Sequence, residues 1–248
     1  MAGHWDRQAA AYDKLIGSHG DPLRAEFLDP ILLDLLGDLK GLQVLDAGCG
    51  NGYLMAKLQA LGAEVTGADS SAELLKLAEQ RFPQCKFLQA DLTQKLPFAD
   101  ASFDLIVSHL VLMDLPQCDI LIAESYRVLR TGARVVMSIL HPLFTPPVGS
   151  FHRGILGRIF PARASYHITN YFQNGCTPKQ IYRSPVTSLY YHRLLSTYIN
   201  SFAAAGFQLS KLLEPRPSRE FLKKYPQYLH ADRIPIFLLA EFKKTAGS

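Results

Sequence analysis

The sequence of 248 residues has few cysteines, no long apolar run and no block of like charges. Its four cysteines, Cys49, Cys85, Cys118 and Cys176, lie far apart and form no CxxC pair. This spacing argues against a disulfide framework or a zinc site and favours a reducing compartment. No apolar run approaches the roughly 18 residues of a membrane span, and the charged N-terminus lacks the apolar block of a signal peptide. We therefore expect a cytoplasmic protein without a membrane span or a metal.

The charge balance is close to neutral, with a formal net charge of +4. Without a run of Lys and Arg, this excess is too weak to indicate nucleic acid as a partner. Hydrophobic residues make up 48% of the chain, which is ample for a sizeable core. The length fits one enlarged α/β domain, so we treat residues 1–248 as a single domain.

Short apolar segments alternate with amphipathic segments in the first half of the chain. The alternation predicts five strands, at Gln43–Asp46, Glu64–Ala68, Lys86–Ala90, Phe103–Ser108 and Arg134–Leu140. Helical patterns separate the first three of these strands, at Tyr53–Leu61 and Ser71–Phe82. Because parallel strands need helical crossovers between them, the pattern predicts an α/β fold with a mostly parallel, doubly wound sheet.

Capping signals mark where several helices should begin and end. Residues 1–40 look helical and form a candidate N-terminal lid, with Gly37 as the stop signal. The segment Ser70–Glu73 fits a capping box at the start of the next amphipathic helix. Pro116 should open a later helix in its first turn, and Gly132 should follow its end.

The alternation breaks down after Leu140. Residues 142–190 are rich in proline, glycine and aromatic residues, with short alternating stretches that favour antiparallel strands. At under 50 residues, this segment would hardly bury a core alone, so we interpret it as an inserted substrate flap. A helical pattern at Leu194–Ala205 and strands at Phe207–Leu213 and Ile234–Phe242 follow, which brings the predicted strands to seven.

A glycine-rich turn follows the first strand, in the segment Val44-Leu-Asp46-Ala-Gly48-Cys-Gly50-Asn-Gly52. Alternate glycines let the backbone turn tightly and leave room for a ligand, although a purely structural turn is the simpler explanation of such a loop. The spacing is GxGxG and not the GxGxxG of nicotinamide enzymes. Asp46 is a poor neighbour for a pyrophosphate but suits a cationic ligand, such as a sulfonium that carries an amino group.

Two more carboxylates end the second and third strands. Asp69 lies 17 residues after Gly52 and can accept both hydroxyls of a ribose. Asp91 can accept from the exocyclic amine of an adenine, and the alternative for it is a solvated strand-end aspartate. Together with Asp46 they would face one ligand crevice, because carboxyl ends of parallel strands meet at one edge of the sheet.

With these residues in place, the sequence resembles the class I S-adenosylmethionine-dependent methyltransferases, in their small-molecule, type 11-like branch. The glycine loop resembles motif I, and the likeness continues through Leu96-Pro-Phe-Ala-Asp-Ala-Ser-Phe103-Asp104, Ser108-His-Leu-Val-Leu-Met-Asp114 and Arg127-Val-Leu-Arg-Thr-Gly132. The resemblance implies a Rossmann-like, seven-stranded sheet with an antiparallel last strand. It also implies S-adenosylmethionine as the cofactor.

The resemblance carries cofactor roles over to particular positions. Gly48 and Gly50 would cradle the methionine end, and Asp46 would orient its amino group. Asp69 and Ser70 would hold the ribose. The remaining implied contacts are Asp91 and Leu92 around the adenine, Ser108 at the fourth strand end, and Tyr12 in the lid. For Tyr12, packing between helices is the competing explanation.

The acceptor is reached by elimination. The sequence lacks the [DNS]PP[YFW] motif of amino-nitrogen nucleic-acid methylases and a cysteine at the fourth or fifth strand end for cytosine C5 chemistry. It also lacks the pair of glutamates that would indicate an arginine methylase, and a catechol-type magnesium site. A small organic acceptor remains, methylated at O, N or C. Aromatic residues of the flap suit an apolar or aromatic acceptor, and its basic residues could meet a carboxylate. These residues are Phe144, Phe151, Phe160, Tyr166, Tyr171, Phe172, Tyr182, Tyr190 and Tyr191, with His152, Arg153, Arg158 and Arg163.

In-line methyl transfer needs a base only when the nucleophile carries a proton of high pKa. The first candidate is His141, after the fifth strand, followed by His192, expected to open the helix after the flap, and by His109. Met113 stands where many relatives carry His. Two other functions stay open, a catalytically silent methyltransferase-like binding module and a nicotinamide-dependent oxidoreductase. The oligomeric state is not predicted.

Overall fold

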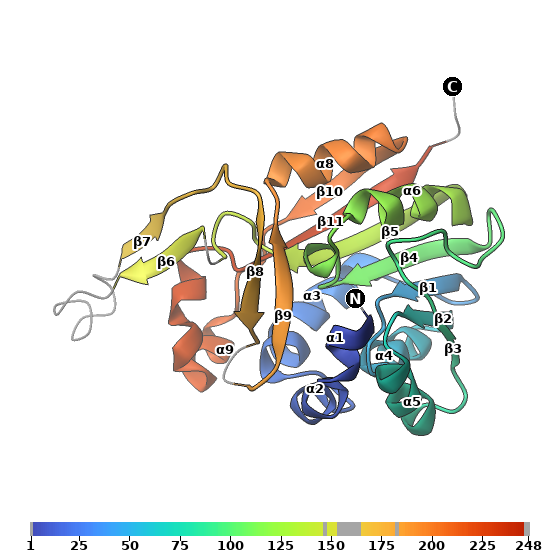
Figure 1. The fold of residues 1–248 in the computed structure, drawn as a ribbon, viewed down its shortest axis with the longest axis horizontal. Helices are drawn as coiled ribbons and strands as arrows, with labels where there is room; N and C mark the ends of the chain where they lie inside the picture. The colour runs from blue at the N-terminus through green and yellow to red at the C-terminus, as the bar shows by residue number, and fades with distance from the viewer. Residues whose placement is uncertain (1, 146–147, 153–164, 182–183, 246–248) are drawn as a thin grey trace.

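Seven strands form one sheet, and helices cover both of its faces (Figure 1). The computed structural model describes residues 2–145, 148–152, 165–181 and 184–245. The strands are β1 (Gln43–Ala47), β2 (Glu64–Asp69), β3 (Lys86–Gln89), β4 (Phe103–His109), β5 (Leu129–Leu140), β6 (Gly149–His152), β7 (Ser165–Ile168), β8 (Gly175–Gln180), β9 (Thr187–His192), β10 (Phe207–Leu213) and β11 (Phe237–Lys244). The α-helices are α1 (Ala2–Asp6), α2 (Ala9–Ile16), α3 (Asp29–Leu36), α4 (Tyr53–Ala60), α5 (Ala72–Arg81), α6 (Cys118–Val128), α8 (Leu195–Ala204) and α9 (Arg219–Lys224). Shorter helical turns are η1 (Arg24–Leu28), η2 (Leu112–Asp114) and η4 (Pro226–Asp232).

The strand order of the sheet is β10-β11-β5-β4-β1-β2-β3. Strands β1 to β5 pair in parallel, whereas β11 pairs antiparallel with both β5 and β10. This confirms the doubly wound, mostly parallel sheet with an antiparallel last strand. No helix in the described ranges is long and apolar enough to cross a bilayer.

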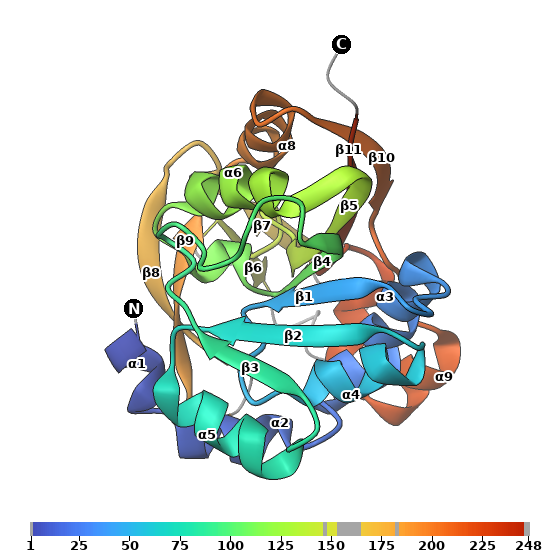
Figure 2. The same cartoon turned by 90° about the vertical axis from the view of Figure 1, so that its right-hand side faces the viewer.

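Alternating side chains divide the core into two layers, one on each face of the sheet. On β1, Val44 packs with α3 and α4, whereas Leu45 packs with α6 and α8. The same period of two recurs on β11, where Leu239 faces the first layer and Leu238 the second. Figure 2 shows α6 and α8 on one side of the sheet and α3, α4 and α9 on the other. The central strands β1, β4, β5 and β11 are therefore largely buried on both faces, as a parallel sheet requires.

Some predicted helix ends were displaced. The N-cap of α5 is Ser71, whose hydroxyl accepts from the Leu74 N–H, and not Ser70, because the backbone at Ser70 still follows the end of β2. Pro116 lies before the N-cap of α6 and not inside its first turn. Gly132 does not end α6 but lies within β5, at φ 81°, where the register of β5 against β4 shifts.

The segment 142–190 contains two antiparallel hairpins, β6–β7 and β8–β9. Strand β9 also contributes Tyr190 to the core of the sheet. In Figure 1 the β8–β9 hairpin lies beside α1, at the edge of the sheet where β1 and β2 end. The division of the chain into a lid at 1–40, a central domain and a flap at 142–190 stays a prediction.

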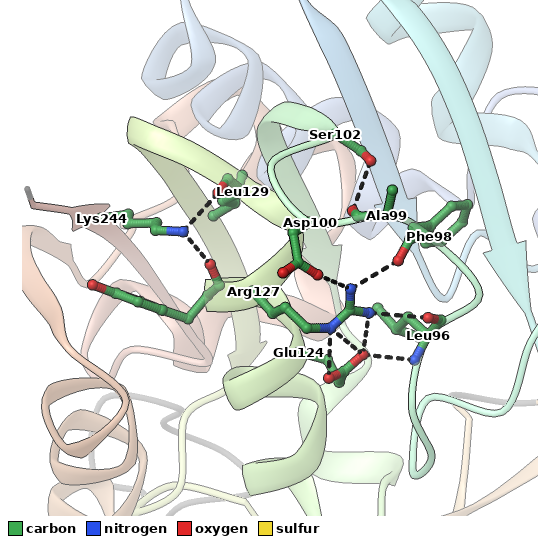
Figure 3. A network of polar contacts seen from close by, with 10 residues as sticks. Leu96, Phe98, Ala99, Asp100, Ser102, Glu124, Arg127, Leu129 and Lys244 are labelled. Atoms are coloured by element: carbon green, nitrogen blue, oxygen red, sulfur yellow. Dashed lines mark hydrogen bonds and ion pairs between the residues drawn. The ribbon is translucent and has the colours of Figure 1, made fainter.

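Arg127 on α6 fastens the long loop between β3 and β4 to the body of the domain (Figure 3). Its guanidinium donates to the Leu96 and Phe98 carbonyls at 3.0 and 2.8 Å. It also pairs with Glu124 at 2.6 Å and Asp100 at 2.7 Å. The Glu124 carboxylate in turn accepts from the Leu96 N–H at 2.8 Å. A loop of irregular backbone is thereby held by two carbonyls and two carboxylates around one planar cation.

We expect Arg127→Ala to lower the free energy of unfolding by about 1–3 kcal/mol, because several charge-assisted hydrogen bonds are lost together. Chemical denaturation followed by circular dichroism measures this change. Arg130→Ala is the matched control, since Arg130 is half-exposed and makes one ion pair, with Asp104. Its cost should be at most about 1 kcal/mol. Equal costs for the two variants would contradict the assigned role of Arg127.

Candidate functional site: a cavity at the carboxyl ends of the strands

A cavity of about 540 Å³ opens at the carboxyl ends of the parallel strands. This is the expected place for a ligand in a doubly wound sheet. One part is lined by the ends of β1, β2 and β3, and the other by η2, the β8–β9 hairpin and η4. Of the predicted cofactor residues, all but Ser108 line it: Tyr12, Asp46, Gly48, Gly50, Asp69, Ser70, Asp91 and Leu92.

The glycine loop is held in place by the Asp69 carboxylate at the end of β2. One carboxylate oxygen accepts from the Gly50 N–H and the other from the Ser71 N–H, each at 2.9 Å. Gly48 has φ 90°, and a Cβ there would lie 2.4 Å from a methyl carbon of Val111. The loop therefore requires glycine at position 48, both for its backbone angle and for its contact with the residues after β4.

Asp46 presents a carboxylate oxygen without a partner. Its Oδ2 is buried and accepts no hydrogen bond within the described protein. Burial, and to a lesser degree the charge of Asp69, raise the pKa of Asp46 to about 7. A buried acceptor of this kind is costly unless a donor arrives. The ammonium group of a methionine-like ligand would satisfy it, so this residue fits the cofactor that the sequence predicts.

The other predicted cofactor positions differ in how they meet the cavity. Asp91 is exposed, and one of its oxygens accepts from the Thr93 N–H and hydroxyl, at 2.9 and 2.7 Å. Leu92 is buried beside it and offers an apolar edge. Ser108 lies within β4, buried and away from the cavity, because the strand continues through His109.

The N-terminal helices are fastened against the glycine loop. Tyr12 packs over Gly50, and the Trp5 and Tyr12 rings meet edge to face with centroids 5.5 Å apart. Asp13 accepts from the Asn51 side chain at 2.7 Å and forms a two-point ion pair with Arg81. The sequence analysis assigned no role to Asn51, although its place between two loop glycines marked it.

A second fastening joins the N-terminal helices to the β8–β9 hairpin. The Gln8 side-chain amide donates to the Thr187 carbonyl at 2.9 Å, and its oxygen accepts from the Thr187 N–H at 2.7 Å. His4 Nε2 lies 2.8 Å from the same carbonyl. We call these contacts between His4, Gln8 and Thr187 the clasp. The clasp joins two segments that are remote in sequence and that both contribute residues to the cavity wall.

His141 and His192 do not line the cavity. His141 Nδ1 accepts from the Leu143 N–H at 3.3 Å, and its Nε2 lies 2.8 Å from Glu214. Burial lowers the pKa of His141, and Glu214 counteracts this. His192 ends β9, so the prediction that it opens the next helix was wrong; that helix begins at Leu195. His192 Nε2 lies 2.8 Å from the Tyr171 carbonyl, and its Nδ1 is buried without a hydrogen-bond partner among the described residues. A general base at either position stays a prediction.

His109 is the histidine at the end of β4 that lines the cavity. Its Nδ1 lies 2.8 Å from the Ser138 hydroxyl, and its Nε2 lies 3.3 Å from the buried Asp29. Asp29 also pairs with Lys57 at 2.5 Å. Although burial alone would raise the pKa of Asp29, contacts with His109 and Lys57 lower it below its ordinary value. Both ring nitrogens of His109 thus serve this network.

The flap aromatics contribute less to the cavity than the sequence suggested. Phe144 lines it, whereas Tyr190 is part of the core and Phe172 is 84% exposed. Tyr166, Tyr171 and Tyr191 do not line it. Outside the described residues or side chains lie Phe151, His152, Arg153, Arg158, Phe160, Arg163 and Tyr182. The flap instead contributes polar residues that the sequence analysis did not select, Lys179 and Ser188.

Comparison with known proteins agrees with the fold and with the loop. Residues 45–137 match the family described as "Methyltransferase domain". The structure of an S-adenosylmethionine-dependent methyltransferase from Mesorhizobium loti superposes with a TM-score of 0.75 at 26% identity, over 91% of this chain and 99% of that one. The chain carries a class I S-adenosylmethionine-dependent methyltransferase domain. S-adenosylmethionine is the cofactor of this class.

Curated relatives of the methyltransferase domain carry different names. A malonyl-[acyl-carrier protein] O-methyltransferase from Hamiltonella defensa is 33% identical over 56% of this chain and 49% of its own length. A demethylmenaquinone methyltransferase from Renibacterium salmoninarum is 31% identical over 56% and 59%. An uncharacterised protein from Haemophilus influenzae is 27% identical over 75% of each chain. The chain thus spans about half the length of the first of these relatives.

Asp69→Ala should weaken S-adenosylhomocysteine binding by about 1–3 kcal/mol, because two ribose hydroxyls lose their acceptor and the glycine loop loses its anchor. Isothermal titration calorimetry measures this loss. Glu79→Ala, at an exposed position of α5, is the control and should bind like the wild type. Unchanged affinity in Asp69→Ala would count against the assignment of the ribose site.

Binding of S-adenosylhomocysteine should release a proton at a pH of about 6.5, because a ligand ammonium favours the ionised form of Asp46. In the ligand-free fold the raised pKa keeps Asp46 protonated, so its ionisation costs stability as pH rises from 3.8 through about 7. Calorimetry in buffers of different ionisation enthalpy counts the proton. Asp46→Asn should abolish the release, whereas Glu79→Gln should retain it. Release that persists in Asp46→Asn would refute this interpretation.

Proposed function

We propose that this protein transfers a methyl group from S-adenosylmethionine to a small organic acceptor. One observation carries the proposal: a single cavity runs from the glycine loop to a chamber under the β8–β9 hairpin. A cofactor at the loop and an acceptor in the chamber would share one enclosed space. Methyl transfer needs this arrangement, because it is an in-line displacement that depends on alignment and exclusion of water.

The residues divide the work between binding and enclosure. Asp69 and Asp91 would hold the ribose and the adenine, and Asp46 would receive the amino group through its unpartnered oxygen. When bound, the cofactor supplies an activated methyl group on a sulfonium. Tyr12 and Trp5 cover the loop, and the clasp joins the N-terminal helices to the hairpin.

The acceptor has to be inferred from this chain's own residues. One relative is named for malonyl-[acyl-carrier protein] and another for demethylmenaquinone, at similar identity over a similar share of this chain. The region shared with these relatives therefore supports use of the same cofactor. We infer that the rest of the chain, in the C-terminal half, determines which acceptor binds. We place the reaction in the cytoplasm, with a small molecule as the acceptor and not a nucleic acid.

The proposal is tested by mass spectrometry with a trideuteromethyl-labelled cofactor and a library of small acceptors. We expect at least one acceptor to gain the labelled methyl group in the presence of the wild-type protein. Asp69→Ala should slow the transfer at limiting cofactor, and Glu79→Ala should not. Tight binding of S-adenosylhomocysteine without transfer to any acceptor would favour a silent binding module, and binding of a nicotinamide cofactor instead would favour an oxidoreductase.

A further inference from the structure

Three elements bring polar side chains together in the chamber under the β8–β9 hairpin. Asp114 comes from η2, just after β4, and Lys179 and Ser188 come from the hairpin. Lys179 and Ser188 are directly opposite each other in the antiparallel register, so their side chains leave the same face of the hairpin. All three residues line the cavity.

Asp114 and Lys179 interact without forming a direct ion pair. Burial raises the pKa of Asp114 to about 7, against the opposing effects of Lys179, Arg24 and a hydrogen bond with Ser188. Burial lowers the pKa of Lys179 to about 8, and Asp114 opposes this shift. The Lys179 ammonium also lies 5.3 Å from the centre of the Tyr190 ring. Near neutral pH, the gain or loss of one proton by Asp114 or Lys179 therefore costs little free energy.

The charges around this chamber balance. Among the described residues, Arg24 is the other Lys or Arg side chain that lines the cavity, and it is already in an ion pair with Asp21. The titratable and charged groups with electrostatic influence on or from Asp114 are Tyr12, Arg24, Lys179, Tyr190, Tyr191 and Tyr198. A carboxylate placed beside Asp114 would be repelled, and an ammonium placed beside Lys179 would be repelled as well. The pair suits a ligand without net charge.

The walls of the chamber are apolar. Met113, Leu140, Phe144, Ile236 and Phe237 line the cavity around the charged pair. An apolar wall with a few convergent polar groups favours a mostly apolar ligand that presents one polar atom. A hydroxyl is such an atom, because it can accept from Lys179 while it donates to Asp114.

We propose, on the basis of the proposed methyl transfer, that Asp114 and Lys179 bind the nucleophilic hydroxyl of an uncharged, phenol-like acceptor. The Lys179 ammonium donates to the acceptor oxygen, and the Asp114 carboxylate takes the hydroxyl proton. A bond forms between this oxygen and the methyl carbon as the bond from that carbon to the sulfonium sulfur breaks. The products are a methyl ether, neutral S-adenosylhomocysteine and one proton, which Asp114 holds until release.

The test compares three probes that share one aromatic ring, are similar in size and differ in charge: phenol, benzoate and benzylamine. Their dissociation constants are measured by NMR titration on protein saturated with S-adenosylhomocysteine. Phenol should bind most tightly to the wild type. Asp114→Asn and Lys179→Met should each weaken phenol binding by about tenfold, as expected when a hydrogen bond to a charged group is lost. In addition, Asp114→Asn should improve benzoate binding, and Lys179→Met should improve benzylamine binding.

The controls separate a binding role from a structural one. Asp119→Asn and Lys211→Met remove the same charges at exposed positions and should change no probe affinity. If Asp114 and Lys179 had only a structural role, their substitution would weaken the binding of all three probes alike. The order of the three affinities would then stay the same. The proposal is overturned if the wild type binds S-adenosylhomocysteine but binds benzoate or benzylamine more tightly than phenol. It is also overturned if the wild type binds S-adenosylhomocysteine but none of the three probes. Failure of S-adenosylhomocysteine itself to bind refutes the proposed function, and the inference with it.

Discussion

The carboxylate of Asp69 joins two turns that leave different strands. It accepts one N–H from the glycine loop after β1 and one from the turn after β2, at equal distances. The Asp69 carboxylate therefore lies where backbone N–H groups of two loops converge, and it fixes both loops relative to the sheet. Replacing it would free the loop that forms the floor of the cavity. The positions of Gly48, of Tyr12 above Gly50 and of the start of α5 all follow from this one group.

The cavity combines two electrostatic environments. At the glycine-loop end, Asp46 is buried and Asp69 is half-buried, and loss of hydration raises the pKa of both. Two carboxyl groups without a cationic partner among the described residues favour the binding of a cation at this end. At the other end, Asp114 and Lys179 compensate each other, and the walls are apolar. This difference favours a cationic ligand at one end and an uncharged ligand at the other, so the two reactants of the proposed transfer would occupy distinct places.

Local sequence patterns were enough to predict residues that, apart from Ser108, line one cavity. The alternating glycines and the three aspartates lie directly at the ends of strands that the local pattern predicts. The pattern therefore located Asp46, Asp69 and Asp91. Errors of one residue arose where an element ran longer than its pattern, as at Ser108 in β4 and at the cap of α5.

The acceptor end could not be predicted in the same way. Asp114 and Lys179 meet only because a hairpin from the inserted segment folds back over η2, and no local period records such a pairing. The same reason explains His141, predicted just after the fifth strand, and His192, predicted to open the helix after the flap, neither of which lines the cavity. Their actual partners, Glu214 and the Tyr171 carbonyl, belong to segments that pattern analysis treated separately.

The clasp has a consequence for the order in which the chain can assemble. Gln8 and Thr187 are 179 positions apart, so the first helices leave the ribosome long before their partner strand exists. Their earlier contacts, Asp6 with Ser71 and Asp13 with Arg81, become available when less than half of the chain has been made. During synthesis, the wall of the cavity beside the glycine loop can therefore form first, and the wall that the hairpin contributes is added only after Lys179 and Ser188 have been translated.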